Sequence, residues 1–461
     1  MSGLLLALAV SLASPFGDGM VLQRERPVPV WGWAEPGTKV AVSFAGQTHD
    51  AVADGEGAWR VTLEPMKACA EPRTLCVEPG ALKVSDVLVG EVWLASGQSN
   101  MAFRFANINP RTKERNGALL AQFVNRPTIR YASVARVDSD EVRRTNSVVW
   151  SAFSPKFLKH GAPSAVATYF ALHLNSALDV PVGIVGCPWG GTNIDAWIPH
   201  DGESAKNALS PRRPCCRPAA IFRGTVAPLA PFAVRGVIWY QGEADCREPE
   251  KYAERMRMLC DGWERAFENE GWPFLFVQIA PYRYDSKRRL VPLQIAQAEF
   301  AASRSNAYMT VVNDIGNIHD IHPNEKGTVG LRLAALALGR VYGFGDVEAD
   351  APVATSAVAA DGGRVEVSFA FGKGLYVYND DRSLDAGFEL AGEDGVFRAA
   401  EITNISKDGV IEGDRVVLSA KGVPEPRSVR FLFCEPWYGA LRNRSGIPAG
   451  PFELEVKKGR E

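Results

Sequence analysis

The middle of the chain alternates two hydrophobic patterns. Continuous apolar runs, which are typical of strands buried on both faces of a sheet, occur at 87–96, 180–187, 234–241, 273–280 and 307–314. Helical periodicity lies between and after them, over 164–178, 251–268, 290–303 and 325–343. Strands that alternate with helices favour a parallel sheet covered on both faces, and such sheets bind ligands at the carboxyl ends of their strands.

The two ends of the chain show only strand patterns. Before Ser85, short strand signals are separated by turns such as EPG and DGEG; they lie at 27–34, 39–46 and 58–65. From about Asp350 the pattern returns, with Gly, Asp and Pro between strands; it covers 363–371, 373–379, 387–392, 415–420, 428–434 and 451–456. Both ends are therefore predicted to be β modules.

A chain of 461 residues is too long for one ordinary domain. The patterns predict three parts: an N-terminal β module over 1–85, an α/β domain over 86–348 and a C-terminal β-sandwich-like module over 349–461. The predicted fold class is α/β, with a three-layer α/β/α parallel sheet flanked by the two β modules.

The composition of the chain limits the kinds of partner that the protein is expected to bind. The net charge of −2 provides no basic field for a polyanion, so nucleic acid is not an expected partner. No run approaches the roughly 20 apolar residues of a membrane-spanning helix, and no membrane span is predicted. The sequence leaves the oligomeric state open.

The N-terminus has two interpretations. Leu4–Val10 resembles the apolar core of a secretory signal, with Ala13 near a small-residue cleavage site, but it lacks the positive charge that usually precedes such a core. The alternative is a first strand, so secretion, export to a periplasm and a cytoplasmic location all stay open. The eight cysteines do not decide between them: Cys69 and Cys76 are close enough for a small disulfide loop, yet unpaired structural thiols are the preferred interpretation.

The first buried strand of the middle domain ends in the sequence SGQSNM at 96–101. A serine just beyond a strand, among small and polar residues, can be presented on a tight turn as a nucleophile. The alternative is that Ser99 caps a following helix. This turn is not the GxSxG elbow of α/β-hydrolases, because Met101 occupies the position of the second glycine.

Two further strands end in polar loops. Gly190 and Gly191 follow one strand, where glycines let the backbone approach a ligand and aim N–H groups at it. Gln241 and Glu243 follow the next strand; the amide of Gln241 can donate to a developing oxyanion, and Glu243 can orient its neighbours. Taken alone, each loop can equally be a turn that satisfies its own backbone.

The last strand leads through Asp314 to Asp320 and His322, immediately before the final helix of the domain. A histidine that takes a serine proton needs a carboxylate on its other ring nitrogen to hold the correct tautomer. Asp320 is close enough in sequence to be that carboxylate. The four loops together supply a nucleophile, oxyanion donors, a base and an orienting group, which is the set that acyl transfer requires.

The blocks GQSNM, GGTNIDAW, WYQGEAD and DIHPNEKGTVGLRLA resemble those of the sialate O-acetylesterases, a branch of the SGNH hydrolases. The segment from Met20 to Thr48 and the terminal β module also resemble that family, so the likeness covers nearly the whole chain. The resemblance implies an SGNH-like domain over 86–348 that removes O-acetyl groups from carbohydrate, with O-acetylated sialic acid as the expected substrate.

The resemblance also implies residue roles. Ser99 is the expected nucleophile, His322 the base and Asp320 its carboxylate partner. The expected oxyanion donors are the Ser99 backbone N–H, Gly191 and Gln241, with Glu243 as a supporting residue. No metal and no cofactor are expected, and HExxH, P-loop and GxGxxG patterns are absent from the sequence.

Two positions depart from the family pattern. Many SGNH hydrolases have an aspartate three residues before the histidine, where this chain has His319, so a Ser–His dyad without Asp320 is an alternative. Arg104 brings charge just after the nucleophile block, and is either a substrate-carboxylate ligand or a solvated surface arginine.

Two other functions stay open at this stage. The same catalytic groups would serve an esterase acting on acetylated xylan or another polysaccharide. The β modules also suit a carbohydrate-binding protein with an inactive hydrolase core, although the presence of both Ser99 and His322 argues against that alternative.

Overall fold

The computed structural model describes residues 10–115, 126–200, 216–285, 287–378, 386–433 and 440–458. They belong to two compact units. Unit 1 comprises Met1–Gln241 and Arg255–Phe274, and unit 2 comprises Gly242–Glu254 and Leu275–Glu461. The division into 1–85, 86–348 and 349–461 stays a prediction. The signal-like segment Leu4–Val10 lies outside the described residues except for its last residue.

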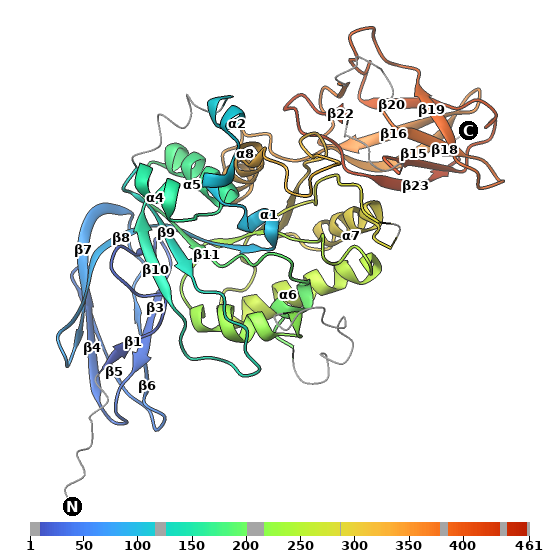
Figure 1. Cartoon of the computed structure of the whole chain (residues 1–461). Coiled ribbons are helices and arrows are strands. Elements are labelled where there is room, and N and C mark those ends of the chain that lie inside the picture. The colour runs from blue at the N-terminus through green and yellow to red at the C-terminus, as the bar shows by residue number, and fades with distance from the viewer. Residues whose placement is uncertain are drawn as a thin grey trace, which may run out of the picture. The chain divides into compact units, whose positions relative to one another are not determined.

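The N-terminal part of unit 1 consists of short antiparallel strands, drawn in blue in Figure 1. One sheet has the order β1-β3-β6, and in a second group β4 pairs with both β5 and β7. In β3 buried and half-buried residues alternate, as expected for a strand with one face toward a core. The strands are β1 (Ser11–Leu12), β3 (Val28–Trp33), β4 (Lys39–Phe44), β5 (Gln47–Val52), β6 (Ala58–Leu63) and β7 (Cys69–Glu78).

The main sheet of unit 1 has neighbouring strands in the order β10-β9-β11-β8-β12. β8, β9, β11 and β12 run parallel to their neighbours, whereas β10 is antiparallel to β9. Every residue of β11 and β12 is buried, which explains their continuous apolar sequences. The expected mixed α/β class is confirmed, and β9 and β10 are additional strands. The bounds are β8 (Leu82–Gly97), β9 (Ile129–Val134), β10 (Val148–Ala152), β11 (Val182–Gly186) and β12 (Gly236–Tyr240).

The four predicted helices are present. In α5 the Ser164 hydroxyl accepts the N–H of Ala167 at 3.2 Å and caps the first turn, and the helix ends where Asp179 adopts a left-handed conformation. The final helix continues from α8 into a π-helical turn, η8. The bounds are α5 (Ala165–Leu178), α6 (Tyr252–Ala266), α7 (Leu290–Ala302), α8 (Lys326–Leu336) and η8 (Ala337–Val341).

Unit 2 contains β13 (Phe274–Val277, whose first residue belongs to unit 1) and β14 (Ala307–Thr310), followed by the C-terminal strands. These strands close into a barrel, shown in orange and red in Figure 1, instead of two open sheets. Phe388, Phe431 and Phe452 lie against one another in its core. The barrel follows the order β15 (Val353–Ala360), β16 (Arg364–Ala370), β20 (Arg415–Ser419), β19 (Arg398–Ile402), β18 (Phe388–Ala391), β21 (Ser428–Phe431) and β23 (Phe452–Lys457).

Within the described ranges the structure has neither a disulfide bond nor a helix suited to span a membrane. Cys69 and Cys76 are free thiols, as are the other cysteines that the structure describes. None of the described helices is both long and apolar enough to cross a bilayer.

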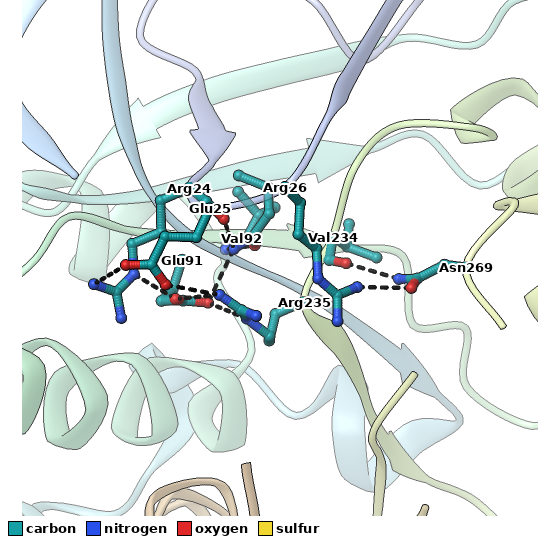
Figure 2. Close-up of polar contacts among 9 residues, drawn as sticks. Arg24, Glu25, Arg26, Glu91, Val92, Val234, Arg235 and Asn269 are labelled. Atoms are coloured by element: carbon teal, nitrogen blue, oxygen red, sulfur yellow. Dashed lines mark hydrogen bonds and ion pairs between the residues drawn. The ribbon is translucent and has the colours of Figure 1, made fainter. Parts of the chain in front are cut away.

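A buried charge network joins the N-terminal strands of unit 1 to its main sheet. Glu91 of β8 has no solvent exposure and lies between two arginines (Figure 2). Arg24 donates to it at 2.6 Å, Arg235 donates through two nitrogens at 2.9 Å each, and Gln23 donates at 3.2 Å. Burial by itself raises the pKa of Glu91, but the hydrogen bonds and charge of Arg235, with the bonds from Arg24 and Gln23, outweigh it and leave the pKa lowered.

Glu91→Gln is expected to destabilise unit 1 by about 3–5 kcal/mol, because it leaves two partly buried guanidinium groups without their counter-ion. The expected measurement is a lower urea midpoint in chemical unfolding. Because the pKa of Glu91 is lowered on folding, its contribution exists above the unfolded pKa and disappears as the pH falls through the folded pKa. The difference between wild type and variant should therefore shrink in acid.

The control is an exposed pair in the same unit, Arg60 with Glu268, which is also bidentate at 2.7 Å. Glu268→Gln should change stability by only about 0–1 kcal/mol, because solvent screens both charges. Equal effects of Glu91→Gln and Glu268→Gln would contradict the role given to the buried network.

Candidate active site

The turn that carries Ser99 is held against the neighbouring strand. Gly97 ends β8 with φ of 131°, and a Cβ there would lie 2.2 Å from the carbonyl oxygen of Tyr240, so only glycine fits. The N–H of Gln98 donates to the same carbonyl at 3.0 Å. The chain then enters α1 (Ser99–Ala102). The position of Ser99 is therefore fixed by close backbone packing between β8 and β12.

Ser99 differs from its neighbours in exposure. Gln98 and Asn100 are buried, whereas Ser99 is half-buried. The N-cap of α1 is Gln98 and no side chain caps the helix, so Ser99 does not act as the helix cap that the sequence left open. Within the described residues the Ser99 hydroxyl has no hydrogen-bond partner. A hydroxyl that supports no local structure and reaches the surface is suited to act as a nucleophile.

The glycine turn after β11 lies beside Ser99. Trp189 donates its N–H to the carbonyl of Gly97 at 2.9 Å, and a Cβ on Gly190 would be 3.4 Å from the Cβ of Ser99. Gly191 has φ of 76° and is exposed. Its N–H, like that of Ser99 in the first position of α1, has no acceptor among the residues that the structure describes. Two N–H donors are thus available near the nucleophile.

The predicted donor Gln241 is fully buried and its Nε2 donates to the carbonyl oxygen of Thr192 at 3.1 Å. Thr192 in turn donates its hydroxyl to the carbonyl of Trp189 at 2.8 Å and accepts the indole N–H of Trp197 at 3.0 Å. Gln241 and Thr192 therefore hold the glycine turn in place through hydrogen bonds.

A buried ion pair holds the same loop farther along. Asp195 follows the glycine turn in η2 (Ile194–Trp197), and its Oδ1 lies 3.2 Å from Nε of Arg255 and 3.8 Å from Nε2 of His200. All three side chains are at most 6% exposed. The GGTNIDAW block contains Asp195, but nothing in the local sequence identifies Arg255 as its partner. The sequence predicted no role for Asp195, Arg255, His200 or Thr192.

His322 and Asp320 lie in unit 2, on the loop before α8. His322 is half-buried and Asp320 is exposed. One carboxylate oxygen of Asp320 accepts the backbone N–H of His322 at 2.9 Å. Burial and the positive charge of Lys326 hold the pKa of His322 below the ordinary 6.5, although the Asp320 carboxylate raises it. Asp320 thus accepts a hydrogen bond from the backbone of His322, and its negative charge raises the pKa of the His322 side chain.

Lys326 is the residue of this loop that the sequence analysis missed. It begins α8 and has no solvent exposure. Burial lowers its pKa to about 7, while the carboxylates of Glu243 and Asp320 oppose this effect. The predicted supporting residue Glu243 is also buried, at 4% exposure. A lysine in the first turn of a helix usually reaches solvent, so the sequence alone did not suggest that Lys326 is buried.

Asp314, the other acidic residue before this loop, is already engaged. Both of its carboxylate oxygens accept hydrogen bonds from Arg332 at 2.7 Å, and Arg442 lies 3.7 Å away. A carboxylate held in this bidentate pair is a structural anchor. His319, at the family's usual aspartate position, is exposed and its N–H donates to Asn317 at 2.9 Å.

The comparisons with known proteins agree with these blocks. The family described as carbohydrate esterase, sialic acid-specific acetylesterase, matches residues 89–338. The chain is 28% identical to the Homo sapiens sialate O-acetylesterase over 387 residues, which cover 74% of this chain and 73% of the human protein. It is also 28% identical to the Mus musculus sialate O-acetylesterase over 401 residues, covering 72% and 73% respectively.

A solved structure is similar over almost the full length. The crystal structure of a carbohydrate acetylesterase from Xanthomonas citri superposes with a TM-score of 0.85 at 33% identity, covering 97% of this chain and 99% of that one. The fold and the sequence blocks thus define a carbohydrate esterase, a hydrolase of acetyl esters on sugars. More specifically, the chain belongs to the sialic acid-specific acetylesterase family.

Proposed function

We propose that this enzyme releases acetate from O-acetylated sialic acid by a two-step serine mechanism. The observation that carries the proposal is the Ser99 turn: a half-buried serine without a structural hydrogen bond lies next to the Gly190 turn and to two N–H donors. Membership of the sialic acid-specific family and the human relative's name support this substrate.

We also propose that the strands and helices of the middle domain form the SGNH-like three-layer α/β/α arrangement. The parallel pairing of β9, β11, β8 and β12 supports it, as does the packing of α5 against β11 and β9. In such sheets ligands bind at the carboxyl ends of the strands; Gln241 directly follows β12, and Ser99 comes two residues after the end of β8.

In the proposed mechanism His322 removes the Ser99 proton, and Ser99 Oγ attacks the acetyl carbonyl carbon. The resulting oxyanion accepts hydrogen bonds from the N–H groups of Ser99 and Gly191 and from the Gln241 amide. The intermediate collapses as the sugar oxygen leaves with the proton from His322, which forms acetyl-serine. Water, deprotonated by His322, attacks this ester, and acetate and free Ser99 result. Asp320 holds the His322 tautomer, and Glu243 supports the loop through Lys326.

The test measures acetate released from O-acetylated N-acetylneuraminic acid, an acetylated xyloside and an aryl acetate. We expect a higher kcat/KM for the sialate than for the xyloside, and equal activity with and without EDTA because no step uses a metal. Preference for the xyloside would indicate a polysaccharide esterase instead. Loss of activity with EDTA and its return with zinc would contradict the serine mechanism.

The pH profile provides a prediction about the base. Because His322 must be neutral to accept a proton and its pKa is lowered, the acid limb of kcat/KM should have its midpoint below 6.5. Lys326→Met removes a positive charge that lowers this pKa, so the midpoint should move upward. An acid limb that keeps its midpoint in Lys326→Met would contradict the electrostatic influence of Lys326 on His322, whatever happens to the maximum rate.

A further inference from the structure

Arg136 is attached to the glycine turn beside the nucleophile. It lies two residues beyond β9, and its Nε donates to the carbonyl oxygen of Pro188 at 2.9 Å. The next residue, Trp189, bonds to Gly97 in the Ser99 turn. Two residues after Pro188, Gly190 lies so near Ser99 that a Cβ on it would be 3.4 Å from the Ser99 Cβ. A short chain of backbone contacts therefore links the Arg136 guanidinium to Ser99.

Arg104 lies on the segment that leaves the Ser99 turn. It follows Ser99 by five residues and forms an isolated β-bridge with Ser164. Its neighbours are held as well: Phe105 donates its N–H to the Pro163 carbonyl at 2.9 Å, and the Phe103 carbonyl accepts the N–H of Ala165 at 2.7 Å. The backbone that carries Arg104 is thus fixed, while the residue itself is exposed.

The segments that carry the two arginines are in contact, because Ser164, the bridge partner of Arg104, donates its N–H at 3.4 Å to the Tyr131 hydroxyl of β9, the strand that Arg136 follows. After burial, the positive charge of Arg104 is the next cause that lowers the pKa of Arg136. Neither arginine has an acidic partner among the described residues. Other arginines of unit 1 do, for example Arg130 with Asp86 and Arg217 with Asp140. Two cations that lack an acidic partner within the described ranges, and of which one acts on the charge of the other, make a local field that favours an anion.

We propose that Arg104 and Arg136 form the subsite that binds the carboxylate of the sugar whose acetyl group Ser99 removes. This inference rests on the proposed function and specifies its substrate as an acidic sugar. A guanidinium has five N–H donors, so the bond from Arg136 Nε to Pro188 leaves its terminal nitrogens for a ligand. Arginine pairs with carboxylates through two parallel hydrogen bonds, whereas a neutral xyloside has no group that uses this charge.

The experiment compares O-acetylated N-acetylneuraminic acid with its methyl ester, which differs only in lacking the charged carboxylate. Arg104→Ala and Arg136→Gln should each raise the KM for the acid by about ten- to a hundredfold, the range for hydrogen bonds to charged groups. The KM for the methyl ester should change less than threefold. Arg104→Lys should recover part of the loss, because lysine keeps the charge but not the planar fork.

Arg364→Gln is the matched control. Like Arg136, Arg364 donates its Nε to a backbone carbonyl, that of Asp361 at 2.9 Å, but it lies in the C-terminal barrel. Arg364→Gln should leave the KM for the acid and the KM for the methyl ester unchanged. Equal losses for acid and ester in Arg136→Gln, or no loss for the acid in either variant, would overturn the subsite. Failure of the wild type to release acetate from any ester would instead overturn the proposed function.

Discussion

Ser99→Ala is expected to reduce acetate release by about 10⁶-fold, the size of effect that loss of the nucleophile has in the serine protease subtilisin. The reason is that, in the proposed mechanism, the Ser99 hydroxyl oxygen forms the acetyl-enzyme. The fold should be unaffected, since the Ser99 hydroxyl has no partner among the described residues. Steady-state rates and the urea midpoint, measured on the same preparation, separate the two effects.

Ser154→Ala is the control for this experiment. The Ser154 hydroxyl accepts the N–H of Phe157 at 3.1 Å and caps α4 (Pro155–His160). Its removal should cost about 1 kcal/mol of stability and leave kcat/KM nearly unchanged. If Ser99→Ala keeps more than about a hundredth of the wild-type rate, Ser99 is not the nucleophile.

Asp320→Asn should lower kcat by about 10⁴-fold if Asp320 holds the His322 tautomer, as the carboxylate does in a serine triad. The asparagine oxygen can still accept the backbone N–H of His322, so the loop conformation should persist. What disappears is the negative charge that raises the His322 pKa. The acid limb of the pH profile should therefore move further down while the maximum rate falls.

Asp314→Asn separates this role from a structural one. Asp314 forms a bidentate pair with Arg332, so its replacement should lower the unfolding midpoint more than the rate. A loss of only a few-fold in Asp320→Asn, with an equally mild effect in Asp314→Asn, would indicate a Ser–His dyad. The exposure of Asp320 makes this measurement informative, since solvent screens an exposed carboxylate more than a buried one.

The sequence located the elements of the middle domain well. The predicted helix over 164–178 is α5 to within one residue, and that over 290–303 matches α7 equally closely. The antiparallel pair β9 and β10 was missed. Although most of β9 is buried, its sequence contains Arg130 and Tyr131, and this mixture of polar and aromatic residues hides the apolar run that identified the other strands.

The amino-acid sequence by itself determined the mixed α/β class, the position of Ser99 after a buried strand and the carbohydrate esterase family. These depend on local periodicity and on short blocks of residues, both of which can be read along the chain. Only the tertiary structure decided which residues that are distant in the sequence contact one another. The contact of Arg136 with Pro188, the ion pair of Asp195 with Arg255 and the burial of Lys326 beside Glu243 join residues between about 50 and 85 positions apart. Hydrophobic periodicity reports which face of an element is covered, but not which distant side chain covers it.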